Sequence, residues 1–209
     1  MNGTVIKNQL IFDFASGLLG PAKSIFASTY LQLNSSASKI GSTFENMLGE
    51  NLLDNENIYP KNLKYTDCLN NENTRSVSNI KDPVTSIFGN LNNLNWKQVY
   101  KGFKEYTASI DDKDEMKLIK MDPGVSVPIH SHGGKEYILV LEGSFCDEYG
   151  EYSKGDIQIN DQKIKHTPIA SRDTGCLCLS ITEKDVIFFG KYGSFLNLFT
   201  FIKSFFRQR

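Results

Sequence analysis

The sequence predicts a mainly β protein, a jelly-roll β-barrel preceded by a small three-helix N-terminal domain. Residues 96–190 carry short runs of strand-forming residues at roughly ten-residue spacing with turn signals between them, which is typical of a β-sandwich or jelly roll. Residues 1–53 instead place apolar residues at helical spacing. A chain of 209 residues is long enough to bury one core and to carry a small accessory domain.

Three helices are expected in residues 1–53. The first is expected over Gln9–Leu19, and Gly20 and Pro21 end it. Pro21 suits the first turn of a second helix that ends near Leu33. In a third helix, apolar residues recur every four positions (Ile40, Phe44, Leu48 and Leu52). Because three short amphipathic helices are too small to be stable alone, we expect them to pack on the second domain or on a partner protein.

A linker and a second domain are expected to follow. Residues 54–81 are rich in Asn, Asp and Lys and carry few apolar residues, which indicates a linker. The second domain is expected over residues 82–190. Its expected strands are Trp96–Tyr100, Thr107–Ile110, Glu115–Met121, Ser126–His130, Tyr137–Glu142, Gly143–Tyr149, Asp156–Ile159, Ile164–Ile169, Cys176–Ile181 and Val186–Phe189.

Residues 191–209 predict an amphipathic tail helix. Five apolar residues share one helical face (Phe195, Leu198, Phe199, Ile202 and Phe206). Lys191, Asn197 and Lys203 interrupt the apolar run, so we expect no membrane-spanning helix. Two interpretations stay open: the helix packs on the barrel or on a second subunit of a homodimer, or it lies on a membrane surface through its Phe side chains and terminal arginines.

Charge and the N-terminal sequence restrict the class of protein. The formal net charge is −1, whereas a protein that binds nucleic acid through phosphate contacts normally presents a basic face. We therefore expect no direct nucleic-acid partner. No long apolar region follows a basic start, so no signal peptide is expected and the predicted location is the cytoplasm.

All three histidines of the chain fall into one pattern with a glutamate. His130 and His132 are two residues apart, so on a strand they point to the same side. The Gly133–Gly134 pair permits a tight reversal, after which Glu136 opens the next strand. His166 is the histidine left to supply a fourth ligand. These side chains predict one divalent metal ion, and imidazoles with one carboxylate suit Zn, Fe, Mn, Ni or Cu. The alternative is an empty site, in which a charged Glu136 would be costly to bury.

Cys176 and Cys178 would lie on one face of a strand. None of the four cysteines has the Cys-x-x-Cys spacing of a zinc or redox motif. Two interpretations remain: buried, inert thiols, or a redox-sensitive pair close to the metal.

The spacing of the proposed ligands resembles the first cupin motif. Its fixed positions are Gly124, His130, His132, Glu136 and Gly143, separated by five, one, three and six residues. Gly155-Asp156 and His166-Thr167-Pro168 resemble the second cupin motif, which contributes the last histidine. Further residues resemble the ChrR-type cupin pattern (Leu141-Glu142-Gly143, Phe145, Asp147-Glu148, Gly150, Tyr152 and Gly175-Cys176). This resemblance implies a cupin barrel and favours zinc as the metal.

The N-terminal segment resembles the zinc-binding domain of ChrR-like anti-sigma factors, in which a helix carries His-x-x-x-Cys-x-x-Cys. The matching positions in this chain are Tyr30, Asn34 and Ala37, and no histidine precedes His130. Tyr, Asn and Ala do not make a structural zinc site, so we expect none there. In the family this helical domain binds the sigma factor.

The sequence is compatible with three functions. The resemblance implies a ChrR-like anti-sigma factor that binds an ECF-type sigma factor and whose metal-binding cupin domain senses a small molecule or an oxidative signal. The second is a metal-dependent enzyme of the cupin dioxygenase type. The third is a cupin that binds a metal or a small-molecule ligand without chemistry.

Overall fold

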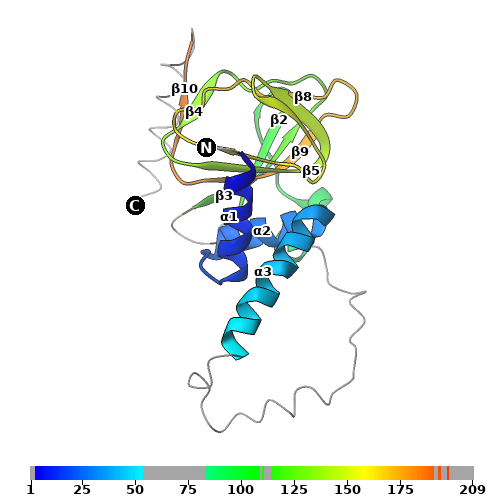
Figure 1. Ribbon diagram of the computed structural model, residues 1–209. Coiled ribbons are helices and arrows are strands. Elements are labelled where there is room, and N and C mark those ends of the chain that lie inside the picture. The colour runs from blue at the N-terminus through cyan, green and yellow to red at the C-terminus, as the bar shows by residue number, and fades with distance from the viewer. Residues whose placement is uncertain are drawn as a thin grey trace, which may run out of the picture.

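A computed structural model describes residues 3–53, 83–108, 110, 114–190, 193 and 197. The predicted linker and nearly all of the predicted tail lie outside these residues. Figure 1 shows three N-terminal helices gathered against one side of a rolled antiparallel sheet, with α3 pointing away from it. The helices are α1 (Gly3–Ala15), α2 (Pro21–Leu33), α3 (Ser35–Leu53), the short α5 (Pro83–Phe88) and the 3-10 turn η2 (Leu91–Asn93). The prediction of three helices before an antiparallel β domain is confirmed.

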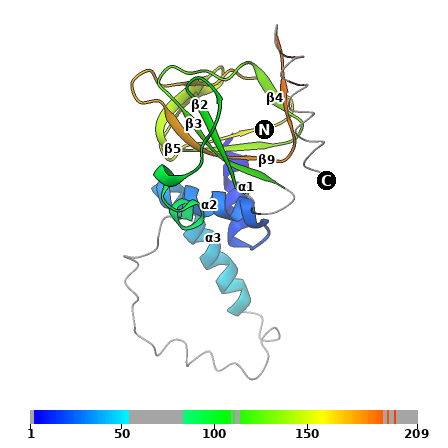
Figure 2. The same ribbon diagram turned by 180° about the vertical axis from the view of Figure 1, so that it is seen from behind.

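The strands form one large sheet and a small one. They are β1 (Lys97–Tyr100), β2 (Phe103–Ala108), β3 (Glu115–Met121), β4 (His130–His132), β5 (Glu136–Asp147), β6 (Gly150–Ser153), β7 (Ile157–Asn160), β8 (Ile169–Ala170), β9 (Cys176–Thr182) and β10 (Val186–Phe188). The large sheet has the order β1-β2-β3-β9-β5-β6, and β7 and β8 also pair with β5. Strand β4 pairs with β10 in the two-stranded sheet. Figure 2 shows the same arrangement from behind, with α2 beneath β5 and β9.

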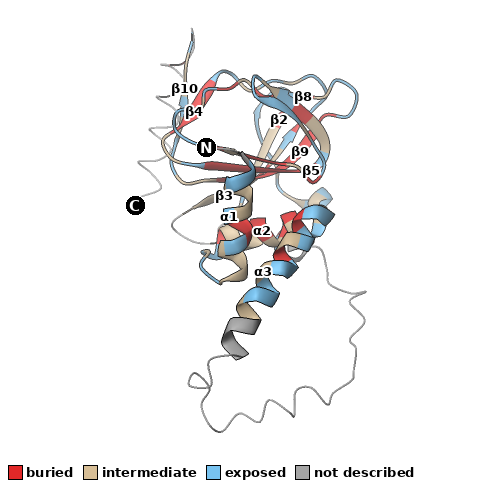
Figure 3. Ribbon diagram, viewed as in Figure 1, coloured by how far each residue is buried: buried red, intermediate tan, exposed pale blue. Residues whose placement is uncertain are grey.

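Strands β5 and β9 separate two cores. Alternate residues such as Leu139 and Leu179 face the helices, and they share a buried cluster with Phe26 of α2. The residues between them, such as Val140 and Cys178, face the inside of the rolled sheet. Figure 3 shows buried positions on β5 and on the α2 surface beneath it. The helices therefore pack on the second domain, one of the two alternatives expected for them.

The first helix differs from its prediction over Gln9–Leu19. Helix α1 begins at Gly3 and ends at Ala15. Gly17 adopts a positive φ of 68°, and its N–H donates to Phe14 O at 3.0 Å. The N–H of Leu18 donates to Asp13 O at 2.9 Å. This pair of bonds is a Schellman motif, which stops the helix before Leu18, a residue 70% exposed.

Several strand boundaries also differ. The strand predicted at Ser126–His130 is β4 at His130–His132, and Ser126 takes part only in an isolated bridge to Ile169. The two strands predicted on either side of Gly143 are one strand, β5, because Gly143 accommodates a bend with φ 69° inside it. Strand β6 was not predicted. No helix among the described residues has both the length and the apolar character needed to cross a membrane.

Candidate metal centre

Four side chains from three neighbouring segments converge inside the rolled sheet. Strand β4 contributes His130 and His132, and β5 begins with Glu136 after the Gly133–Gly134 turn. His166 lies beside β4, where its N–H bonds His130 O at 3.0 Å and its carbonyl accepts from His130 N at 3.1 Å. The sequence pattern placed all four in one site, and the structure brings them together.

The ligand atoms are close and shielded from water. One atom from each of the four residues lies within 4.8 Å of all the others. The residues are 5%, 1%, 4% and 0% exposed in the order His130, His132, Glu136 and His166. Glu136 Oε2 lies 2.9 Å from His132 Nε2 and 3.7 Å from His166 Nε2. The four ligand atoms are thus close enough to one another to share one ion.

Unsatisfied polar atoms test whether a cation fits here. Both ring nitrogens of His132 and Nε2 of His166 are buried without a hydrogen-bond partner among the described residues. His132 Nε2 is near Glu136 Oε2 but is not in hydrogen-bonding geometry with it. A buried polar atom left unpaired costs about 1–3 kcal/mol, and a cation at the centre would pair Nε2 of both histidines. The donor set of three imidazoles and one carboxylate fits a single divalent ion.

A second layer of contacts orients the ligands. His130 Nδ1 lies 2.9 Å from Pro128 O, and His166 Nδ1 lies 2.9 Å from Asp147 Oδ2. These contacts turn Nε2 of each ring toward the centre. Asn160 Nδ2 donates to Glu136 Oε2 at 3.3 Å. Sequence reasoning assigned neither Asp147 nor Asn160 to the site, although a polar residue such as Asn160, directly after Ile159 at the end of β7, was a usable signal.

Burial and neighbouring charges fix two protonation states. Burial lowers the pKa of His130 to about 4. Burial opposes ionisation of Glu136, but the contacts with His132 and the nearby imidazoles outweigh it and lower its pKa below the ordinary value. At neutral pH, His130 is therefore neutral and Glu136 charged, which are the states that bind cations.

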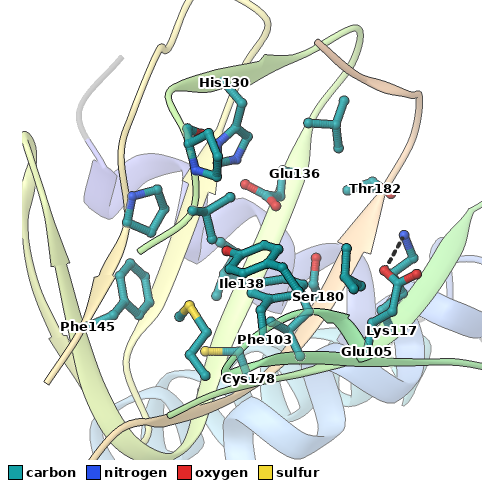
Figure 4. A pocket seen from close by; sticks show the side chains of 18 of the residues that line it. Phe103, Glu105, Lys117, His130, Glu136, Ile138, Phe145, Cys178, Ser180 and Thr182 are labelled. Carbon is teal, nitrogen blue, oxygen red and sulfur yellow. Dashed lines mark hydrogen bonds and ion pairs between the residues drawn. The ribbon is translucent and has the colours of Figure 1, made fainter. Parts of the chain in front are cut away.

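A cavity of about 720 Å³ opens onto the cluster. Figure 4 shows His130 and Glu136 on one side of this cavity and the Glu105–Lys117 ion pair on the other. Between them the walls are mostly apolar, with Phe103, Ile138 and Phe145 among the lining residues. The volume lies within the range of small-molecule sites, roughly 300–1,000 Å³.

Cys178 also lines the cavity, and its sulfur lies 3.2 Å from that of Cys176. Both thiols are buried on the same face of β9, as expected. The contact with Cys176, together with burial, raises the pKa of the Cys178 thiol well above its ordinary value. The thiolate is thus disfavoured, which agrees with the interpretation as a core pair in the resting state.

Tyr30, Asn34 and Ala37, the positions compared above with the zinc ligands of ChrR-like anti-sigma factors, lie where α2 meets α3. Asn34 Oδ1 accepts from Ala37 N at 3.0 Å and so caps α3, while Asn34 Nδ2 donates to Gly155 O at 3.2 Å. Tyr30 and Ala37 are buried at 6% and 2% exposure. Packing and a capping side chain hold the junction of α2 and α3 without metal-ligating chemistry.

Comparison with known proteins gives consistent matches. The family model of the ChrR cupin-like domain matches residues 85–184. The anti-sigma-E factor ChrR of Cereibacter sphaeroides is 33% identical over 115 residues, which are 54% of this chain and 52% of that protein. The chain thus spans about half the length of this curated relative in the match.

A solved structure extends the likeness. A chain in the crystal structure of Rhodobacter sphaeroides SigE in complex with the anti-sigma ChrR matches with a TM-score of 0.70 at 26% identity. The match covers 84% of this chain and 96% of that chain. Residues 85–209 are less than two thirds of this chain, so the structural match takes in the N-terminal helices as well.

Proposed function

Residues 85–184 of this chain form a ChrR cupin-like domain, and from this premise we propose that the protein is an anti-sigma factor with a metal-binding sensor domain. The helices bind a sigma factor of the ECF type, and the cupin barrel holds one divalent ion and responds to a small molecule or an oxidative signal. Such a protein acts in the cytoplasm, where RNA polymerase is found.

The observation that carries the proposal is the structural match to a chain of a sigma–anti-sigma complex over 84% of this chain. A cupin that had only its barrel in common with ChrR would not match across the helices. Apolar side chains exposed on the helices give a partner something to bury: Val5 is 59% exposed and Phe12 37% exposed. The missing N-terminal zinc ligands do not argue against this role, because Asn34 caps the helix junction in their place.

Co-expression of the full chain with ECF-type sigma factors, followed by affinity purification, tests sigma binding. A one-to-one complex is expected with one of them. The variant Val5→Glu places a charge at an exposed position of α1 and should weaken the complex. Ile187→Glu, at a 41% exposed position on β10, is the matched control and should not weaken it. If no sigma factor co-purifies with the wild-type chain, the anti-sigma function is wrong.

We propose zinc as the ion, with Fe, Mn and Ni as alternatives. His130, His132 and His166 would supply Nε2, and Glu136 would supply Oε2. Zinc binds imidazole and carboxylate ligands readily and supplies no redox chemistry of its own, which suits a sensor that must remain stable until a signal arrives.

The cavity beside the cluster favours a second candidate function. A metal-dependent dioxygenase would need a largely apolar space next to its ion, and the cavity of about 720 Å³ provides one. In that case the iron-loaded protein should consume oxygen with diketone-like substrates. A zinc-containing protein without turnover on such substrates would favour the sensor.

A further inference from the structure

One lysine of helix α2 reaches the segments on both sides of the candidate metal ligand Glu136. We propose that Lys23 positions the loop carrying His132 and Glu136, so that metal binding and helix docking are coupled. This inference rests on the metal site proposed above, and it gives the contacts that link that site to the helices.

Lys23 lies between the helices and the rim of the barrel. Its Nζ lies 2.8 Å from Glu183 Oε1 and 3.4 Å from Asp114 Oδ2, and it lies 5.5 Å from the centre of the Tyr137 ring. The Lys23 side chain is only 21% exposed. A partly buried ammonium needs these partners, and moving α2 away from the sheet would separate the lysine from both carboxylates.

Glu183 links Lys23 to the loop that carries the ligands. Its Oε1 accepts from Lys23, and its Oε2 accepts from the backbone N–H of Lys135 at 3.0 Å. The N–H of Glu183 also donates to Lys135 O at 3.0 Å. Lys135 is the residue directly before Glu136. A Cβ added to Gly134 would lie 3.1 Å from Glu183 Cβ, so the turn and Glu183 are in direct contact.

The first residues of β5 give a second connection. Glu136 faces the metal centre, whereas Tyr137 faces the helices because successive strand residues alternate sides. The Tyr137 ring packs edge-on against Phe26 of α2, with 5.9 Å between ring centres. A shift of α2 would therefore displace Tyr137, the residue after Glu136. Through Glu183 it would also displace Lys135, the residue before it.

The consequence is reciprocal coupling. Metal binding requires His132 and Glu136 to keep one relative position. The contact of Lys23 with Glu183 supports the turn before Glu136, and its contact with Tyr137 supports the residue after it. If docked helices favour the metal-binding geometry, the bound metal must favour docked helices by the same factor.

Zinc affinity of the full chain, measured by competition with a chromophoric chelator, tests the positioning role. Lys23→Met should lower the affinity about fivefold or more, at the lower end of typical coupling between sites. Lys23→Arg should restore most of it. Lys39→Met, at an exposed position of α3, is the matched control and should bind zinc with the affinity of the wild type. Glu183→Gln, which leaves α2 unaltered, should lower the affinity similarly, and the double variant should lose less than the sum of the two.

Hydrogen exchange gives a readout that general destabilisation does not imitate. Zinc should slow amide exchange in Pro21–Leu33 of the wild type, and this effect should be lost in Lys23→Met. Failure of the wild-type chain to bind zinc would overturn the metal site and this coupling with it. Zinc binding by the wild type with equal affinity in Lys23→Met would overturn the coupling alone.

Discussion

Replacing Asp147 with asparagine should impair metal binding although the residue touches no ligand atom. Its Oδ2 lies 2.9 Å from His166 Nδ1 and accepts from Gln158 Nε2 at 2.7 Å. Its Oδ1 accepts from the backbone N–H groups of Tyr149 at 2.9 Å and Gly150 at 3.2 Å. Both oxygens are therefore acceptors, and an amide can supply only one.

The asparagine oxygen should take the Oδ1 position, where two fixed backbone donors point at it. The NH₂ group then faces His166 Nδ1 and can only donate, so His166 must carry its proton on Nε2, the atom that faces the ion. Outer-sphere partners of histidine ligands typically contribute 10- to 100-fold to metal affinity. We expect a loss in this range for Asp147→Asn, which corresponds to about 1.4–2.8 kcal/mol.

Competition with a chelator of known zinc affinity measures this loss. Asp173→Asn, in an exposed loop before β9, makes the same chemical change away from the site and should leave the affinity unaltered. Circular dichroism and thermal unfolding of the metal-free chains show whether both variants fold. Wild-type zinc affinity in a folded Asp147→Asn protein would refute the role of Asp147.

Three further predictions concern stability. Phe26→Ala empties a position with 0% exposure between helix and sheet and should lower the free energy of unfolding by about 3–5 kcal/mol, measured with urea; a loss below about 1 kcal/mol would mean that the helices are not docked. Asn34→Ala should cost about 1 kcal/mol in the same assay, because Ala37 N loses its cap, and an unchanged unfolding midpoint would contradict this. Burial opposes ionisation of Glu183, but chiefly the bond from Lys23 lowers its pKa below the ordinary value, so its contribution is present above the unfolded-state pKa and lost as pH falls through the native pKa. Stability curves against pH should therefore fall less on the acid side in Glu183→Gln, and identical acid limbs would show that the contact contributes nothing.

Local patterns in the sequence carried most of the fold. The apolar spacing and Pro21 predicted α2 with its observed bounds, and the strand-forming run at Glu115–Met121 is β3. One error lies where glycine has two roles. Gly143 was expected to separate two strands, whereas a positive φ of 69° lets it bend one strand that continues to Asp147.

The candidate site was predictable only in its first layer. His130, His132 and Glu136 lie within seven residues, so strand alternation and one tight turn bring them together. Asp147 lies 19 residues from the histidine it orients, and Asn160 lies 24 residues from Glu136. These partners meet through strand pairing, such as the register that places Asn160 opposite Glu136, and no short sequence motif specifies that register.

Contacts between the helices and the barrel were the least accessible to sequence reasoning. Lys23 and Glu183 are 160 residues apart and belong to parts of the chain whose docking no local pattern fixes. Amphipathic spacing showed that the helices need a partner surface, but it did not choose between the sheet and another protein. The choice depends on the matching apolar face of β5 and β9, which exists only in the folded sheet.

Anomalous diffraction at the zinc edge, on crystals of the zinc-loaded full chain, tests the central claim most directly. We predict one strong peak per chain, about 2.0–2.2 Å from Nε2 of each of the three histidines and from a carboxylate oxygen of Glu136. A fully occupied peak elsewhere, or none at this cluster in protein soaked with excess zinc, would contradict the account.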